Sequence, residues 1–368
     1  MRAAPRRVGD DCPRHPLAAP PDRTPPSQVT DPGSRLFRPD MLMIGATGRN
    51  TGKTELACRV IRHHAARVPI AALKVTTVVR TDGSCPRGGE GCGVCSTLGE
   101  AWCVTRELDA DSDKDTSRLL GSGAREAYWL RVRHEALEEG AAGLLAHVPA
   151  GWVSVCESNS LSRVIEPGLF LQVRAASERS TKASARAVAS LADRVVVSDG
   201  TDFDLPPDRI SLLDGQWALR REACAVVVAD KPPHHSLLAS LRAQFTQVET
   251  AEATTEPGDH RSPLRGLASA LPRSACEWCL VVWGADSSAP AGLVNALFRR
   301  REGVEAILAS GPSRDPAGRI GLFHRRLLPA IAAARGGPEP NVRDLSEIAR
   351  VRDLRVGPAS LPGDGERC

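Results

Sequence analysis

The stretch that most constrains the fold of this chain is residues 41–61, MLMIGATGRNTGKTELACRVI. An apolar, strand-like run breaks into a glycine-rich turn and then resumes as a helix, which is the order that a phosphate-binding P-loop requires. One departure from the pattern G-x-x-x-x-G-K-[ST] is Thr47, which stands in the position of the first glycine. The alternative is a glycine-rich turn before an ordinary helix, but that alternative does not require strand, loop and helix in this order.

Each residue of the loop has an expected task. Backbone N–H groups are expected to point at a β-phosphate, with a helix N-terminus behind them. The residues assigned to this contact are Thr47, Gly48, Asn50, Thr51 and Gly52. Lys53 is expected to reach the β- and γ-phosphates, and the Thr54 hydroxyl to hold Mg²⁺. Only five of the 48 basic residues are lysines, which favours a role for Lys53 that a planar guanidinium cannot fill.

The length and the periodicity predict two α/β domains. A chain of 368 residues with 42% hydrophobic content can build two substantial cores. Strand and helix signals alternate after the P-loop, as in a parallel sheet covered by helices. The expected parts are a disordered Pro- and Arg-rich lead-in (1–40), a P-loop nucleotide-binding domain (41–200), a linker (201–222), a second α/β domain (223–357) and a tail (358–368). For the linker, a short hairpin and a hinge are both open. Met41 directly precedes the first expected strand, which leaves Met1 and Met41 open as the start.

Charge and hydropathy narrow the classes of partner. The formal net charge of +4 is small for this length, and no basic patch with interleaved aromatic residues accompanies it. No nucleic-acid partner is therefore expected. No apolar run approaches the ~20 residues that span a bilayer, so no membrane is expected either. The lead-in lacks the apolar segment of a secretion signal, and a cytoplasmic location is predicted.

The chain contains eleven cysteines, which in a reducing compartment are expected to be free thiols or metal ligands. Four of them gather in an expected Gly-rich loop over residues 81–103, namely Cys85, Cys92, Cys95 and Cys103. The two-residue spacing from Cys92 to Cys95 lets both sulfurs face one ion, and the four together predict a Zn²⁺ or iron–sulfur site. A redox pair or a loop with unpaired thiols remains the open alternative.

Charged residues at strand ends complete the predicted nucleotide site. Lys74 ends the strand after the P-loop helix, the turn 157–159 begins with Glu157 at the end of an apolar strand, and the corner 199–200 follows another strand. Ligands of α/β sheets bind at this edge. A carboxylate at the end of a buried strand is costly without a partner such as a metal, so Glu157 is assigned to the Mg²⁺ shell or to positioning water. For Asp115, catalysis and helix N-capping are both open.

The order of these motifs resembles the molybdopterin-guanine dinucleotide biosynthesis protein B family. The matching segments lie within residues 41–200 and are Gly52-Lys53-Thr54, Lys74, Lys114-Asp115-Thr116, Gly123-Ala124 and Glu157. The resemblance implies a P-loop fold that binds GTP with Mg²⁺, with Lys74 and Lys114 at the nucleotide. It also implies molybdopterin and molybdoenzyme maturation proteins as partners. The chain departs from the family by Ser158 after the acid, by the absence of histidines after the lysine, and by the cysteine loop.

The second half resembles the nucleotidyltransferase fold of the molybdopterin guanylyltransferases. Those enzymes begin with a long Gly-rich loop ending in D-K and later carry an aspartate that holds Mg²⁺. Here Asp230-Lys231 follows the first strand without such a loop, and Asp286 precedes Pro290. Because that loop cradles the triphosphate, a degenerate transferase domain is expected.

Three functions remain. The favoured one is a GTP-binding accessory protein of molybdenum-cofactor assembly, with at most weak GTPase activity. The second is an enzyme, either a bifunctional transferase that uses Asp230, Lys231 and Asp286 or a P-loop kinase of a small metabolite. The third is a sensor or scaffold in which the cysteine loop binds metal and the nucleotide acts as a switch.

Overall fold

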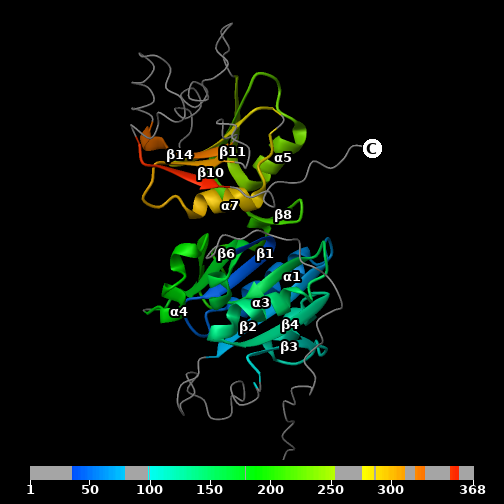
Figure 1. The fold of residues 1–368 in the computed structure, drawn as a ribbon. Helices are drawn as coiled ribbons and strands as arrows, with labels where there is room; N and C mark the ends of the chain where they lie inside the picture. Colours follow the sequence, from blue (N-terminus) through cyan, green and yellow to red (C-terminus); the bar gives the residue numbers. More distant parts are fainter. Residues whose placement is uncertain are drawn as a thin grey trace, which may run out of the picture. The chain divides into compact units, whose positions relative to one another are not determined.

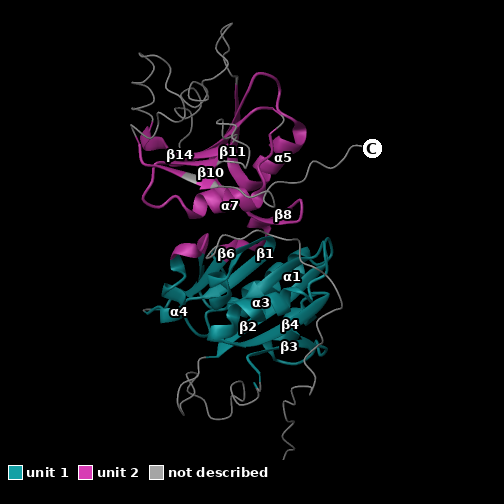
Figure 2. Cartoon of the chain, viewed as in Figure 1, with its two compact units in different colours: residues 1–166, 171–189, 195–204 teal, residues 167–170, 190–194, 205–368 magenta. Residues whose placement is uncertain are grey.

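The structure, a computed structural model, describes residues 35–78, 98, 100–178, 180–252, 276–285, 287–310, 320–327 and 349–355. The chain forms two compact units, coloured separately in Figure 2, and each is α/β. Unit 1 comprises Met1–Glu166, Leu171–Ala189 and Val195–Asp204, and unit 2 comprises Pro167–Phe170, Ser190–Arg194 and Leu205–Cys368. Within the described residues, no helix is long and apolar enough to cross a membrane.

Unit 1 contains a seven-stranded sheet in the order β3-β4-β2-β5-β1-β6-β7. The strands, labelled in Figure 1 where there is room, are β1 (Leu36–Ala46), β2 (Ile70–Val78), β3 (Trp102–Glu107), β4 (Glu126–Arg133), β5 (Val153–Glu157), β6 (Ile165–Ala175) and β7 (Arg194–Ser198). The central strands are parallel: β1 pairs with β5, β5 with β2, and β2 with β4. Their carboxyl ends therefore meet at one edge of the sheet, as expected for a ligand-binding α/β fold.

The helices of unit 1 are α1 (Lys53–His64), α2 (Asp115–Gly121), α3 (Leu137–Leu145) and α4 (Ala183–Arg186), with short 3₁₀ helices at His134–Ala136, Ser160–Arg163 and Ala189–Leu191. The two longer ones, α1 and α3, each bury a largely apolar face. In α3 the buried positions are Leu137, Gly140, Ala141 and Leu144, which follow the helical repeat. A Cβ on Gly143 would come within 2.7 Å of the Trp102 ring, so glycine lets α3 approach β3 closely.

The first strand begins earlier than the sequence predicts. Residues 35–40 were expected in the disordered lead-in, but β1 starts at Leu36. The Leu36 N–H donates to the carbonyl oxygen of Val164 at 2.9 Å, and Arg35 forms a salt bridge with Glu166 at 3.2 Å. The side chains of residues 36–40 are half-buried, and Arg38, Pro39 and Asp40 interrupt the apolar pattern, so hydrophobic patterning misses a segment that backbone pairing holds in the sheet.

Two further elements lie in the segments expected to be the cysteine loop and the linker. Strand β3, Trp102–Glu107, begins within the expected loop 81–103 and pairs antiparallel with β4. The linker 201–222, for which a short hairpin or a hinge was expected, contains the hairpin of β8 (Ile210–Leu213) and β9 (Gln216–Leu219), after a 3₁₀ turn at Pro207–Arg209. The hairpin turn is Asp214-Gly215, and both residues have positive φ, 49° and 73°. An Asp-Gly pair is a common sequence for such a two-residue turn.

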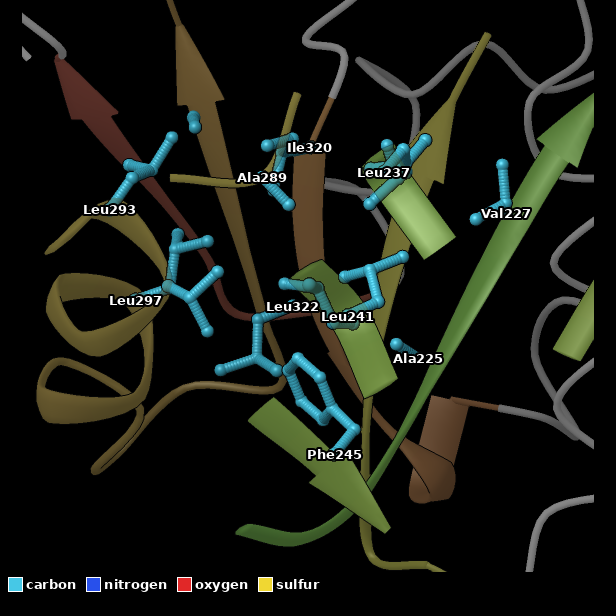
Figure 3. Packing of buried hydrophobic residues seen from close by; sticks show 14 of the residues in the cluster. Ala225, Val227, Leu237, Leu241, Phe245, Ala289, Leu293, Leu297, Ile320 and Leu322 are labelled. Carbon is cyan, nitrogen blue, oxygen red and sulfur yellow. The ribbon is translucent and has the colours of Figure 1, made fainter. Parts of the chain in front are cut away.

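Unit 2 contains a six-stranded sheet in the order β11-β10-β12-β14-β13-β15. Its elements are β10 (Arg221–Ala229), α5 (His235–Gln244), β11 (Phe245–Glu252), β12 (Trp278–Trp283), α7 (Ala291–Arg299), β13 (Ala306–Ser310), β14 (Ile320–His324), a 3₁₀ turn (Arg325–Leu327) and β15 (Val351–Arg355). Strand β14 runs antiparallel to both of its neighbours, so the sheet is mixed. In Figure 3, side chains of α5 and α7, among them Leu241 and Leu297, pack with Leu322 and Phe245 in the core.

Candidate functional site

The segment that the sequence predicts to be a P-loop joins the end of β1 at Ala46 to the start of α1 at Lys53. Asn50 and Gly52 both adopt positive φ, 54° and 90°, and Gly52 is the N-cap residue of α1. A Cβ on Gly52 would lie 3.2 Å from the Phe203 ring, so this position requires glycine for both conformation and space. The Gly52 carbonyl oxygen accepts the N–H of Leu56 at 2.9 Å. The helix therefore begins directly at the turn, which leaves the N–H groups of its first residues for a ligand.

Neighbouring strands fix the beginning of this loop. Asn159 accepts the N–H of Ala46 at 3.0 Å and donates to the Ala46 carbonyl oxygen at 2.8 Å. Thr47 donates its N–H to Val173 in β6 at 2.9 Å. Thr51 is buried, and its hydroxyl has no hydrogen-bond partner within the described part of the chain. The loop is thus held between β6 and the segment that follows β5, while the Thr51 hydroxyl has no hydrogen-bond partner among the described residues.

Lys53 and Glu157 form the centre of the site. The register of the sheet places Glu157 opposite Ile44 on one side and opposite Lys74 on the other. The Lys53 Nζ lies 3.4 Å from Oε2 of Glu157, whose side chain is 0% exposed. Among the described residues, neither oxygen of this carboxylate accepts a hydrogen bond. A buried carboxylate with one distant cation as its partner is costly, and such a group is well suited to bind a metal ion.

Asp115 lies beside this pair and does not cap its helix. The N-cap of α2 is Lys114, with no side-chain cap hydrogen bond, and the Asp115 carboxylate instead accepts from Lys74 Nζ. Burial alone would raise the pKa of Asp115, but the hydrogen bond and charge of Lys74, together with Lys53 and the Thr54 hydroxyl, lower the pKa below its usual value. Asp115 is therefore a carboxylate near neutral pH, next to the first turn of α1.

The predicted residues thus converge from α1, β2, α2 and β5. The group comprises Lys53, Thr54, Lys74, Asp115 and Glu157. Two carboxylates and a hydroxyl are the oxygen ligands that Mg²⁺ prefers, and two ammonium groups complement phosphate. The unsatisfied oxygens of Glu157 are the observation by which this set fits Mg²⁺.

The end of β7 also lies beside the predicted P-loop. Ser198 ends β7, and its Oγ would lie 3.5 Å from a Cβ on Gly52. The Asp199 carboxylate accepts the N–H groups of Thr201 and Asp202 at 2.8 and 2.7 Å. The structure therefore brings Ser198 to the loop, whereas the predicted corner 199–200 is exposed beside it.

Other candidate residues lie elsewhere. Lys114 is exposed immediately before α2, and Asp230 and Lys231 are exposed after β10 in unit 2. Cys103 is buried in β3, where its Sγ accepts a hydrogen bond from Arg131 at 3.7 Å. Asp286, Cys85, Cys92 and Cys95 fall outside the described residues. Within the residues that the structure does describe, no group of three or more His, Cys, Asp or Glu side chains could hold a metal.

Sequence reasoning did not identify Glu178. Its carboxylate accepts from the Thr47 hydroxyl at the beginning of the P-loop, although the two residues are 131 positions apart. The only signal for Glu178 in the sequence is its place shortly after a strand, and that signal is shared by many acids.

No family model matches this chain, and no curated protein matches it either. Among solved structures, a protein from Aquifex aeolicus VF5 aligns with 14% identity and a TM-score of 0.29 over 39% of this chain and 94% of its own. A protein from Desulfovibrio desulfuricans G20, provisionally described as a nucleotide-diphospho-sugar transferase, aligns with 9% identity and a TM-score of 0.26 over 37% of this chain and 80% of its own. These scores are too low to carry an argument about fold or function.

Proposed function

We propose that unit 1 binds GTP with Mg²⁺, and that the chain is a cytoplasmic accessory protein of molybdopterin guanine dinucleotide assembly. The observation that carries the nucleotide proposal is Glu157, which is fully buried, lies 3.4 Å from Lys53 Nζ, and has two oxygens without a hydrogen-bond partner among the described residues. A protein stabilises such an arrangement poorly by itself, whereas a metal-bound phosphate ligand completes it.

The residues of the site have separate tasks in this proposal. Backbone N–H groups of the loop and of the first turn of α1 hold the phosphates. Lys53 places a positive charge against them. Thr54, Asp115 and Glu157 would hold Mg²⁺, which neutralises phosphate charge when bound. Lys74 keeps Asp115 oriented toward this group.

The assignment to molybdenum-cofactor assembly is supported by the order of the motifs along the chain. Lys53, Lys74, Asp115 and Glu157 match the protein B family in that order, and the fold brings the same four residues together. Unit 2 has an α/β sheet, but Asp230 and Lys231 are exposed after β10 without a preceding Gly-rich loop. A docking role for unit 2 fits this arrangement better than triphosphate chemistry.

The test is an equilibrium titration of the full-length protein with fluorescent GTP and ATP analogues in the presence of Mg²⁺. Lys53→Ala is expected to weaken GTP binding by roughly 100-fold, since it removes a charge from a partly buried phosphate site. Lys231→Ala is the matched lysine variant in unit 2, and its affinity should stay within about twofold of the wild type.

Each contrary result has a distinct meaning. A large loss with Lys231→Ala and none with Lys53→Ala would move the nucleotide to unit 2 and favour the transferase alternative. Preference for ATP would contradict the guanine assignment alone. Absence of binding to the wild type would refute the P-loop proposal.

A further inference from the structure

The position where the P-loop departs from its motif has a partner outside the loop. Thr47 replaces the first glycine, and its hydroxyl contacts the carboxylate of Glu178, which follows β6. The hydroxyl also lies 3.2 Å from the Val173 carbonyl oxygen, which accepts the Thr47 N–H at 2.9 Å as well. Of these two acceptors the carboxylate is the charged one, and charged acceptors form the stronger hydrogen bonds. The threonine therefore holds a negative charge at the beginning of the loop.

The next residue provides the space for this charge. A Cβ on Gly48 would lie 2.8 Å from the carboxyl carbon of Glu178, so any larger residue there would displace the carboxylate. The segment that carries Glu178 is itself fixed by backbone hydrogen bonds. Glu178 donates its N–H to Ala175 at 3.0 Å, and Lys182 donates its N–H to Thr47 at 2.9 Å. Thr47 thus donates a hydrogen bond to the Glu178 carboxylate, and Gly48 leaves the space that this carboxylate occupies against the loop backbone.

The charge of Glu178 differs from the other acids near the loop. Glu157 lies beside Lys53, and Asp115 is paired with Lys74. Glu178 makes no ion pair within the described part of unit 1. A polyphosphate in the loop brings further negative charge toward Glu178, and like charges at short range repel. A cation bound with the phosphates reduces that repulsion.

We propose that Glu178 is a specificity-determining residue of the nucleotide site, which disfavours metal-free polyphosphate and thereby makes binding depend on Mg²⁺. This inference rests on the proposed function. The proposal also explains why threonine and glycine occupy positions 47 and 48 of the motif, since these two residues hold the Glu178 carboxylate in place. Removing the charge strengthens nucleotide binding, and the gain is largest in the absence of Mg²⁺.

The experiment compares wild type and Glu178→Gln, as full-length proteins, by titration with a fluorescent GTP analogue in Mg²⁺ and in EDTA. Glutamine keeps the shape and the acceptor for the Thr47 hydroxyl and loses only the charge. Affinity is expected to rise roughly tenfold in EDTA and about threefold in Mg²⁺, and the difference should shrink at high salt. Glu178→Ala, which also removes the charge, is expected to shift affinity in the same direction.

Glu139→Gln is the matched control, because it changes the net charge equally. Glu139 is exposed on α3, which packs on β3 and β4 at the edge of the sheet away from β6. Its affinity should stay within about twofold of the wild type in both buffers. Equal or weaker binding by Glu178→Gln, in a wild type that binds GTP, overturns the role of Glu178 alone. If neither protein binds nucleotide in either buffer, this role and the proposed function are both refuted.

Discussion

Each unit contains a buried carboxylate, and the two carboxylates differ in their hydrogen-bond partners. In unit 2, Asp193 Oδ2 accepts from the Arg299 guanidinium at 2.7 Å and from the Phe170 N–H at 2.7 Å, and the two charged side chains are 1% and 3% exposed. The other oxygen of Asp193, Oδ1, has no hydrogen-bond partner among the described residues. In unit 1, Glu157 is equally buried, its salt-bridge partner among the described residues is Lys53 Nζ at 3.4 Å, and neither of its oxygens accepts a hydrogen bond there. A carboxylate with short hydrogen bonds holds a fold together, whereas an unsatisfied one is a site for a ligand.

The largest expected effect is on the salt bridge between Asp193 and Arg299. Arg299→Met leaves Asp193 buried without this salt-bridge partner, and the free energy of unfolding of unit 2 should fall by about 3–5 kcal/mol. Urea denaturation followed by tryptophan fluorescence measures this change. Arg106→Met is the control, because its salt bridge with Glu126 involves an arginine side chain that is 46% exposed, and the expected change is within about 1 kcal/mol. If Arg299→Met lowers the free energy of unfolding by less than about 1 kcal/mol, Asp193 does not hold unit 2 together, and the contrast with Glu157 of unit 1 is lost.

The matching change in unit 1 should affect binding and leave stability intact. Glu157→Gln removes a buried charge that makes no hydrogen bond among the described residues, so stability should stay equal or rise by about 1 kcal/mol. Mg²⁺-dependent nucleotide affinity should fall by roughly 10- to 100-fold, as for other groups that orient a metal. Thermal denaturation and calorimetric titration measure the two quantities. Strong destabilisation with unchanged binding would make Glu157 a structural acid like Asp193.

The sequence predicted the elements that follow simple patterns. The apolar strand β5 ends in Glu157, as its sequence pattern predicts. Lys74 was expected to end its strand, but it lies in the middle of β2, which continues to Val78, and it is opposite Glu157 in the register of the sheet. The position of Glu157 has a physical reason, because parallel strands are buried on both faces and ligands bind at their carboxyl ends.

The failures also have physical reasons. The start of β1 and the edge strand β3 have mixed burial, so their pairing depends on partners that are distant in sequence and not on a local period. The contact between Thr47 and Glu178 joins residues 131 positions apart. The role of Asp115 was undecided, because only the fold shows that Lys74 occupies its carboxylate.

The smallest expected effect concerns this pair of Lys74 and Asp115. The pKa of Asp115 is lowered from 3.8, so its carboxylate stabilises the fold above about pH 4, and this contribution is lost as the pH falls through the lowered folded pKa. Its side chain is 39% exposed, so solvent screening keeps the effect small. Asp115→Asn should flatten the decline in unfolding free energy as the pH falls below about 4. Asp111→Asn, at an exposed aspartate four residues earlier, is the control. If both variants follow the wild-type curve, Asp115 contributes nothing to folding, and its contact with Lys74 serves the ligand alone.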